Sequence, residues 1–449
     1  MNFAGVRVLV VGLGRSGQAA VELLLAQGAR VCAADLTPPA GPVLERLREA
    51  GVEFRPQSPE VFREAHWIVL SPGVPADLPE LEEARGRGAR VIGEVELASY
   101  YLRGPVLGIT GSNGKTTTTA LTGHILRHAG IPVQVGGNIG IPACSLVASS
   151  RADQWNVLEL SSFQLETIER FRAHVAVGLN LTPDHLDRHR TFENYAAKKA
   201  RLFETQRPGD HAVLNRDDPA CAAWARRTPA AVHWFSLRGD APEGACLREN
   251  TLWLGGRPLM PASDIPLRGL HNVENVLAAA LAARLTGAPA EAIAEAVRSF
   301  PGVEHRLEFV CRVRGVEFYN DSKATNVDAA LKALQAFEGP LWVILGGKDK
   351  DGDFRPLREP LRQKARAVLL IGAAAEKIAR QLEGAVPLAS CGTLENAVEY
   401  AFRRAVPGDT VLLAPACASF DQFENFEHRG RVFKQLVASL AARSAAEES

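Results

Sequence analysis

Short apolar runs alternate with segments of helical spacing along the first hundred residues. The apolar runs lie at 6–11, 31–34, 67–70 and 90–92, and the segments of helical spacing lie at 18–27, 43–50 and 94–101. Runs of this length predict buried strands, and their alternation with helices is typical of a parallel sheet covered by helices. The first part of the chain therefore predicts a Rossmann-like domain.

The same alternation continues through the rest of the chain. The further predicted strands lie at 105–107, 156–159, 174–179, 316–319, 341–345, 367–371 and 410–414, and the helices at 116–128, 192–203, 270–284, 328–337, 374–382 and 393–405. Periodicity is lost over 230–265, where only short β-like pieces remain. We predict an α/β chain of three domains: 1–93, 94–300, and a second Rossmann-like domain at 301–449.

Length and composition agree with several ordinary globular domains. A chain of 449 residues is too long for one core. Lys+Arg and Asp+Glu number 51 each, so no overall field favours nucleic acid or an anionic membrane. No apolar run approaches the roughly 20 residues that a bilayer requires, and the N-terminus lacks a signal-peptide layout, so we expect a cytoplasmic protein without membrane insertion. The seven cysteines form no C-x-x-C pair, which argues against a disulfide framework or structural zinc.

A glycine-rich loop follows the apolar run 105–107 and precedes a helical segment. The loop reads G-I-T-G-S-N-G-K-T-T over 108–117, and it departs from the usual P-loop pattern because Ile109 stands where glycine is expected. Backbone amides, a lysine and a hydroxyl would converge there on a triphosphate. We expect Lys115 to meet the β/γ-phosphates and Thr116 to meet Mg²⁺, which makes 94–300 a P-loop ATPase-type domain with a parallel or mixed sheet.

The N-terminal domain carries a second phosphate-binding pattern. Gly12, Gly14 and Gly17 form G-x-G-x-x-G after the first strand, and Asp35 follows Gly17 by 18 residues at the end of the second strand. This is the dinucleotide fingerprint, and by itself it supports a nicotinamide-dependent dehydrogenase. The loop that begins at Ser71 ends another predicted strand, where open α/β sheets bind ligands; a proline-stiffened turn is the alternative.

Two side chains at predicted strand ends are candidates for metal chemistry. Glu159 ends a strand, where a carboxylate can reach the magnesium beside a P-loop threonine; a solvated strand end is the alternative. His185 stands among oxygen-bearing residues after the strand 174–179, which favours a ligand or catalytic role over simple packing. His189 follows by four residues, but without the glutamate of H-E-x-x-H a zinc-protease interpretation is weak.

Six motifs together resemble one family. They are T-G-S-N-G-K-T at 110–116, G-N-I-G at 137–140, E-L-S-S-F-Q-L-E at 159–166, D-H at 184–185, H-N at 271–272 and D-S-K-A-T-N at 321–326. This set resembles the Mur ligases of peptidoglycan synthesis, and the resemblance extends from Val8 to Phe433. It implies an ATP-dependent amide ligase that works through an acyl phosphate, with ATP and two Mg²⁺ ions as cofactors.

The last domain bears on which amino acid is added. Ligases of the family that add a diamino acid or lysine typically carry D-[ND]-P-[RN] there, and the sequence after Pro301 has no such segment. The stretch 414–419, with Phe426 and Arg429-Gly430 after it, instead resembles the glutamate-adding branch. The implied substrates are UDP-N-acetylmuramoyl-L-alanine and D-glutamate, with the protein acting as a monomer.

The resemblance also implies roles for individual residues. The implied catalytic residues are Lys115, Asn138, His185 and Lys199, and the implied metal ligands are Thr116, Glu159, His185 and Lys199. ATP would be bound by Gly111, Ser112, Asn113, Gly114, Lys115, Thr116, Thr117, Asn275, Arg306, Asp321 and Lys323. The UDP substrate would be bound by Gly14, Arg15, Ser16, Asp35, Thr37, Ser71, Gly73 and Asn138, and D-glutamate by His185, Thr325, Lys350, Ser419 and Phe426. Lys199 is the lysine that relatives carbamylate, unless the register slips by one to Lys198. Arg15 departs from the aliphatic residue often found beside the uracil.

Three alternatives remain at this point. Another Mur-type or folylpolyglutamate-type ligase would share the P-loop, although folylpolyglutamate synthases lack the N-terminal domain of Gly12 to Asp35. A dehydrogenase would use the first fingerprint and leave the P-loop without a task. A nucleotide-binding regulatory module would tolerate loss of Glu159, His185 and Lys323.

Overall fold

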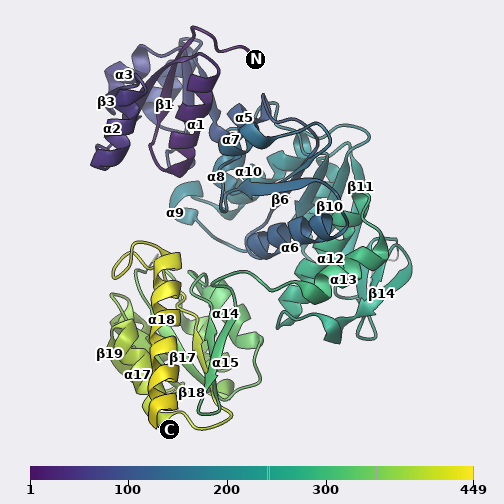
Figure 1. Cartoon of the computed structure of the whole chain (residues 1–449), viewed down its shortest axis with the longest axis vertical. Helices are drawn as coiled ribbons and strands as arrows, with labels where there is room; N and C mark the ends of the chain where they lie inside the picture. Colours follow the sequence, from purple (N-terminus) through teal and green to yellow (C-terminus); the bar gives the residue numbers. More distant parts are fainter. Residues whose placement is uncertain (240, 242, 350, 448–449) are drawn as a thin grey trace. The chain divides into compact units, whose positions relative to one another are not determined.

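The computed structural model describes residues 1–239, 241, 243–349 and 351–447 of the 449 (Figure 1). They form two compact units, the first made of Met1–Asp264 with Glu274–Phe300, and the second of Ile265–Val273 with Pro301–Ser449. The chain therefore passes between the units at three places.

The first unit begins with a five-stranded parallel sheet. Its order is β3-β2-β1-β4-β5, and its strands are β1 (Arg7–Val11), β2 (Arg30–Asp35), β3 (Glu53–Pro56), β4 (Trp67–Leu70) and β5 (Arg90–Gly93). Alternate strand residues enter different cores. Val8 and Val10 pack on the side of α1 (Arg15–Ala26), whereas Leu9 and Val11 pack on the side of α3 (Pro59–Arg63) and α4 (Pro79–Gly86). α2 (Gly41–Glu49) connects β2 to β3.

A nine-stranded mixed sheet follows in the same unit. Its order is β14-β13-β12-β11-β10-β9-β6-β8-β7, with β6 (Val106–Thr110), β7 (Val133–Gly137), β8 (Trp155–Glu159), β9 (Val175–Gly178), β10 (His211–Asn215), β11 (Ala231–Ser236), β12 (Ala245–Arg248), β13 (Thr251–Leu254) and β14 (Arg257–Pro261). The seven strands β6 to β12 pair in parallel with one another, and β13 and β14 add antiparallel strands at one side. The stretch 230–265, where the pattern predicted only short β-like pieces, contains the strands β11 to β14 on one side of this sheet.

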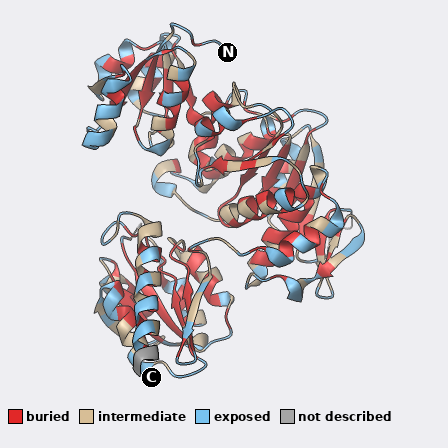
Figure 2. Ribbon diagram, viewed as in Figure 1, coloured by how far each residue is buried: buried red, intermediate tan, exposed pale blue. Residues whose placement is uncertain are grey.

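Helices connect these strands and join the two sheets of the first unit. They are α5 (Glu94–Ser99), α6 (Lys115–His128), α7 (Ala143–Leu146), α8 (Ser162–Leu165), α9 (Leu186–His189), α10 (Phe192–Glu204), α11 (Pro219–Ala223), α12 (Leu270–Leu285) and α13 (Ala290–Ser299). The first turn of α12 is counted in the second unit. One buried apolar cluster includes Val8 of the first sheet, Leu97 of α5, Cys144 of α7 and Leu158 of the second sheet. Figure 2 shows the strands of both sheets as mainly buried. The two sheets thus share a core.

The second unit contains a six-stranded sheet of order β15-β16-β20-β17-β18-β19. Its strands are β15 (Glu308–Val313), β16 (Val316–Asn320), β17 (Leu341–Gly346), β18 (Ala365–Ile371), β19 (Leu388–Gly392) and β20 (Thr410–Leu413), and only β15 runs antiparallel to its neighbour. One core lies on the side of α14 (Val327–Gln335), α15 (Arg358–Lys364) and α16 (Ala375–Leu382), and another on the side of α17 (Leu394–Arg404) and α18 (Phe426–Glu447).

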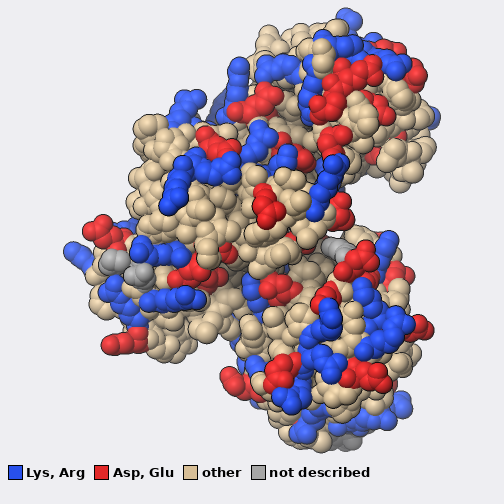
Figure 3. All heavy atoms as spheres, turned by 180° about the vertical axis from the view of Figure 1, so that it is seen from behind, with Lys and Arg blue, Asp and Glu red and all other residues tan. Residues whose placement is uncertain are grey.

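The predicted α/β fold class with three sheet domains is therefore confirmed. The exact limits at 93/94 and 300/301 stay predictions. Among the described residues, no helix is both long and apolar enough to span a membrane. On the face shown in Figure 3, basic and acidic side chains are interspersed, as the equal totals of 51 and 51 lead one to expect.

Candidate active site

The P-loop lies between β6 and α6, and β6 is the third strand from the β7 edge of the nine-stranded sheet. Gly114 caps the helix with φ +83°, and a β-carbon there would lie 2.1 Å from Asn275 Oδ1, so both the backbone angle and the space require glycine. Lys115 is the first helical residue, and its Nζ donates to the carbonyls of Gly111 (2.9 Å) and Ser112 (2.8 Å). Asn275 thus comes from a distant helix to the predicted nucleotide loop.

Residues that follow β9 hold the P-loop in place. Asn180 Oδ1 accepts from the Asn113 amide at 2.9 Å, and Ser112 Oγ donates to the Thr182 carbonyl at 2.9 Å. The Tyr195 hydroxyl of α10 lies 3.0 Å from the same Ser112 Oγ. These contacts preorganise the loop. Asn180 and Tyr195 were not among the predicted site residues, although the position of Asn180 at a strand end was a signal for it.

Glu159 ends β8 and is only 2% exposed. Its Oε1 accepts from Asn138 Nδ2 at 2.8 Å, while Oε2 is buried and has no hydrogen-bond partner among the described residues. A buried carboxylate oxygen without a partner is costly, and oxygen is the ligand that Mg²⁺ prefers. Glu159 therefore fits a bound cation. Within the residues described, no three His, Cys, Asp or Glu side chains gather as a complete metal set, so such an ion would also need ligands of other types.

Two consecutive lysines of α10 point to different places. Lys199 is 1% exposed, and its Nζ donates to the Gly111 carbonyl at 2.9 Å and lies 4.8 Å from the centre of the Tyr195 ring. Burial, with Lys115 nearby, lowers the pKa of Lys199 well below its ordinary value, which favours the neutral amine. Lys198 Nζ instead lies 3.4 Å from Glu166 Oε1 and is one-third exposed. Lys199 is therefore the lysine at the P-loop.

The two histidines of the 184–189 segment differ in their surroundings. His185 precedes α9 with φ 52°, lies 3.6 Å through Nε2 from Asp184 Oδ2, and is 38% exposed. Its ring centre lies 4.9 Å from that of Phe163. His189 is buried, lies 2.9 Å through Nε2 from Ser162 Oγ, and stacks on Phe163. His189 is thus a packing residue, whereas His185 keeps access to solvent.

Apart from Asn138, which follows β7 of the second sheet, the residues predicted to bind the UDP group lie at the carboxyl ends of strands of the first sheet. Gly14 follows β1, Asp35 ends β2 and Ser71 follows β4, and these strands are neighbours in parallel register. Asp35 Oδ2 accepts from the Leu13 amide at 2.6 Å, so this carboxylate supports the glycine turn. Arg15 Nη2 donates to the Gly140 carbonyl at 2.6 Å. The other predicted residues at this edge are Ser16 in α1, Thr37 after β2, and Gly73 after β4.

In the second unit, the predicted residues lie at the carboxyl ends of β16 and β20. Asp321 is 1% exposed; its Oδ1 accepts from the Leu307 amide at 3.2 Å and lies 3.7 Å from Arg306 Nη1. Burial raises its pKa, against the opposing charge of Arg306. Lys323 Nζ lies 4.8 Å from the ring centre of Phe426. Thr325 lies in the same loop as Lys323, Ser419 is buried after β20, and Lys350 lies outside the described residues.

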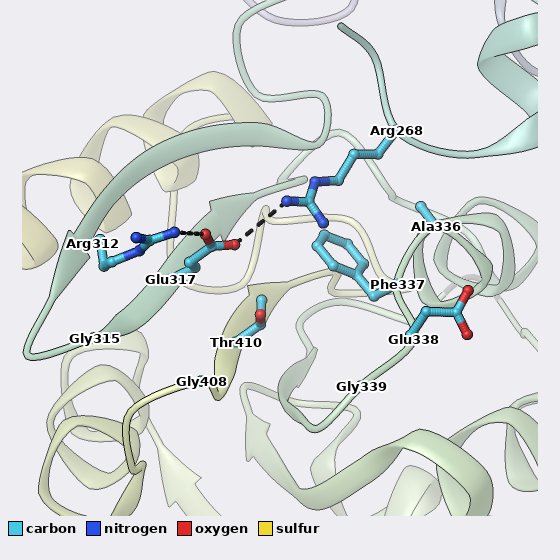
Figure 4. Close-up of a pocket in the computed structure, with 10 residues that line it drawn as sticks. All are labelled: Arg268, Arg312, Gly315, Glu317, Ala336, Phe337, Glu338, Gly339, Gly408 and Thr410. Carbon is cyan, nitrogen blue, oxygen red and sulfur yellow. Dashed lines mark hydrogen bonds and ion pairs between the residues drawn. The ribbon is translucent and has the colours of Figure 1, made fainter. Parts of the chain in front are cut away.

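A separate pocket of about 520 Å³ lies at the other end of this sheet (Figure 4). Its lining includes Glu317 near the start of β16 and Thr410 at the start of β20. Arg268 reaches it from the segment 265–273; its Nη2 lies 3.5 Å from Glu317 Oε2, and its guanidinium lies 5.5 Å from the Phe337 ring centre. None of the predicted site residues lines this pocket.

Family comparisons agree with the arrangement of sheets and loops. The chain matches "Mur ligase MurD-like, N-terminal domain" over 6–93, "Mur ligase middle domain" over 109–283, and "Mur ligase, glutamate ligase domain" over 305–417. The chain belongs to the Mur ligase family. As a Mur ligase it is ATP-dependent, and the P-loop lies within the part that matches the middle domain.

Individual relatives of this Mur ligase match over nearly their full length. It is 64% identical over 440 residues to the UDP-N-acetylmuramoylalanine–D-glutamate ligase of Solibacter usitatus, covering 98% of this chain and 99% of that protein. The protein of the same name from Acidobacterium capsulatum is 54% identical, with 99% and 98% covered.

Solved structures of other ligases share the fold of this Mur ligase. The pseudomurein peptide ligase type C of Methanothermus fervidus has a TM-score of 0.63 at 20% identity, covering 97% and 100% of the two chains. The MurF ligase of Thermotoga maritima in complex with ADP has a TM-score of 0.61 at 16% identity, covering 97% and 96%.

Proposed function

We propose that this Mur ligase adds D-glutamate to UDP-N-acetylmuramoyl-L-alanine, with hydrolysis of ATP to ADP and phosphate, in cytoplasmic peptidoglycan precursor synthesis. The observation that carries the proposal is the 64% identity, over 98% of this chain, to a relative whose name states these substrates. The P-loop supports it, since a dehydrogenase would leave that loop without a task.

The reaction would pass through an acyl phosphate. A carboxylate oxygen of the alanyl group attacks the γ-phosphorus of ATP, and ADP leaves. The nitrogen of D-glutamate then attacks the acyl carbon, loses a proton, and phosphate leaves as the amide forms. Several anions must meet in the first step, so positive charge from Lys115 and preorganised amides of the P-loop would lower its barrier.

Two magnesium sites complete the proposal. Thr116 and Glu159 would hold one ion, because the Glu159 Oε2 atom is buried without a partner among the described residues. His185 and a carbamylated Lys199 would hold the second. Bound Mg²⁺ would neutralise charge on the phosphates. Because a neutral amine is the form that takes up carbon dioxide, the burial of Lys199 favours the modification.

The remaining residue roles stay proposals at the same level. We assign the loops after β1, β2 and β4 to the UDP group, Asn138 to positioning the acyl phosphate, and the loops after β16 and β20 to the amino acid. Arg306, Asp321 and Lys323 would contribute to ATP binding.

An ADP-release assay tests the proposed reaction. UDP-N-acetylmuramoyl-L-alanine is supplied with a panel of D- and L-amino acids, and release should be fastest with D-glutamate and absent without the UDP substrate. Preference for another amino acid would refute the assigned substrate. Titration with NADH addresses the dehydrogenase alternative, which would require micromolar binding and reduction of a hydroxy acid.

A further inference from the structure

Arg429 is the largest fully buried side chain of the described residues and lies in the first turns of α18. Its Nε donates to Ser322 Oγ at 2.9 Å and its Nη2 to the Ser322 carbonyl at 2.8 Å. Both terminal nitrogens donate to the Cys417 carbonyl at 3.2 Å. In the part of the chain that the structure describes, no carboxylate pairs with it.

These contacts join the loops to which we assign the amino acid. Ser322 lies in the loop after β16 that carries Lys323 and Thr325, and Cys417 lies two residues before Ser419 in the loop after β20. Ser322 Oγ in turn donates to the carbonyl of Phe426 at 2.8 Å. One guanidinium thus fixes both loops and, through one hydroxyl, the start of α18.

A third loop lies against the same group. A β-carbon at Gly347, which follows β17, would lie 2.2 Å from the Ala418 carbonyl and 3.2 Å from Arg429 Nη1. The φ of Gly347 is +135°, a conformation that favours glycine. The loop that leads on to Lys348 can therefore approach Arg429 only because residue 347 has no side chain.

Arg429 carries a positive charge although its side chain is buried. Burial lowers its pKa to about 10, which leaves the guanidinium charged at neutral pH. A buried cation is costly unless it is compensated, and the hydrogen-bond partners of Arg429 are neutral carbonyl and hydroxyl oxygens. Asp421 is the carboxylate whose charge opposes the effect of burial on the pKa of Arg429, but it forms no ion pair with Arg429 among the described residues. A fixed positive charge at this place would attract an anionic ligand, since buried charges are screened only weakly.

We propose that Arg429 is the positioning residue of the amino-acid site, holding the loops after β16 and β20 and favouring an amino acid with an anionic side chain. The inference rests on the proposed function, because it concerns the site assigned to D-glutamate. Arg429 would act through Ser322, Ser419 and Phe426 rather than by touching the substrate.

Three variants separate geometry from charge. Arg429→Lys keeps the charge but loses the planar fork, Arg429→Met loses both, and Ser322→Ala removes only the hydroxyl that links Arg429 to Phe426. Arg431→Met is the matched control, because Arg431 lies two residues along the same helix and is exposed. The measurements are kcat and KM for each of the three substrates, the rate with D-glutamine relative to D-glutamate, and Tm.

We expect Ser322→Ala and Arg429→Lys to raise the KM for D-glutamate about tenfold, the loss expected from one hydrogen bond to a charged group. The KM for ATP should rise less, although Asp321 and Lys323 flank Ser322, and the KM for the UDP substrate should stay within about twofold. Arg429→Met should in addition lower the preference for D-glutamate over D-glutamine. Arg431→Met should change none of these values.

The wild-type enzyme separates failure of this inference from failure of the proposed function. If wild type releases no ADP with D-glutamate, the proposed function is wrong. If wild type is active but Ser322→Ala and Arg429→Lys keep a normal KM for D-glutamate, the positioning role is wrong. An equal rise in all three KM values would reduce Arg429 to a general stabilising residue and also overturn the inference. Should the Arg429 variants fail to fold, Ser322→Ala decides, because it removes a single buried oxygen.

Discussion

Two buried titratable residues beside the P-loop are explained best by the ligands we propose. Glu159 keeps one carboxylate oxygen buried without a partner in the described structure, and Lys199 is buried beside Lys115 with its pKa lowered by burial. A buried polar atom without a partner calls for an explanation, and a buried lysine with a lowered pKa is a candidate for function. A cation at Glu159 and a carbamate on Lys199 would each remove the cost.

Replacing Lys199 tests the second magnesium site. Lys199→Ala should lower kcat at least a hundredfold, because the carbamate oxygen ligand is lost, and acetate or formate should restore part of the rate by occupying the vacated position. Steady-state ADP release measures both effects. The assay is run with and without acetate or formate at about 100 mM, roughly the concentration that a weak ligand needs.

Lys198→Ala is the control for that experiment. Lys198 pairs with Glu166 on another side of α10, and one step along a helix turns a side chain by about 100°. Its loss should leave activity nearly unchanged. If Lys198→Ala is the inactive variant, the assignment of the carbamylated lysine is off by one residue; if both variants are active, the second-metal proposal is wrong.

Replacing Lys115 tests the P-loop assignment. Lys115→Ala should lower kcat by 100-fold or more, on the order expected for a transition-state phosphate contact. Its Nζ donates to two carbonyls of its own loop, and these bonds hold no other element in place, so Tm should change little. An ADP-release assay and a thermal melt provide both values, and retention of more than about a tenth of the activity would contradict the assignment.

Site residues that stand in local patterns could be predicted from the sequence, and those that depend on tertiary burial could not. Lys115 and Glu159 follow from a glycine-rich loop and a strand end, which are visible in the residues themselves. Arg429-Gly430 was part of the pattern that resembles the glutamate-adding branch, but the burial of Arg429 could not be predicted, because it depends on loops that lie 12 and 107 residues away. The supporting roles of Asn180 and Tyr195 likewise appear only when β9 and α10 are placed beside the P-loop.

At the scale of elements, the pattern predicted most buried strands and predicted edge strands poorly. The buried inner strand β10 is an exception, because it was not among the predicted strands. β17 has six buried residues in succession, and its apolar run was recognised. β19 is an edge strand whose residues are half-buried or exposed, so it has no apolar run to find. β15 also lies at an edge and pairs antiparallel, and its sequence lacks a continuous apolar run for the same reason.

The junction between α5 and α7 carries a testable pH dependence. Glu94 is 1% exposed; its Oε1 accepts from the Cys144 amide at 2.6 Å, while its Oε2 has no hydrogen-bond partner in the described residues. Burial raises the pKa of Glu94 to about 7, against the opposing hydrogen bond from Cys144. The folded protein holds this proton more tightly than the unfolded chain does. The contribution of Glu94 to the free energy of unfolding is therefore fully present below pH ~4.5 and is lost as pH rises through about 7.

Glu94→Gln should remove that pH dependence. As pH rises from 5.5 to 8, the free energy of unfolding of the variant minus that of wild type should increase by on the order of 2–3 kcal/mol, because the amide cannot ionise. Denaturant melts across this range measure the difference, with Glu45→Gln on the exposed face of α2 as control. A constant difference between Glu94→Gln and wild type at every pH would contradict the expectation.

At the scale of the whole molecule, the cores define how the chain divides. The two sheets of the first unit share one apolar cluster, so we expect them to unfold together. The second unit has its own cores on both faces of its sheet. The second unit also includes the segment 265–273, which stands in the sequence between the two stretches that form the first unit.

This division leads to a prediction for the isolated fragment 301–449. The fragment keeps both cores of the second unit and should fold cooperatively, but it lacks Arg268, which pairs with Glu317 and lies over the ring of Phe337 (Figure 4). Arg268 also lies over the ring of Tyr319. An exposed ion pair and two cation–π contacts are together worth about 1–2 kcal/mol, so the fragment should be less stable than the same unit in the full chain by at least that amount.

Circular dichroism and denaturant melts measure the stability of the fragment. In the full chain, Arg268→Ala should lower the stability of the second unit by about 1–2 kcal/mol without affecting that of the first. A fragment with helical signal but no cooperative melt would show instead that the segment 265–273 is required for the unit to fold.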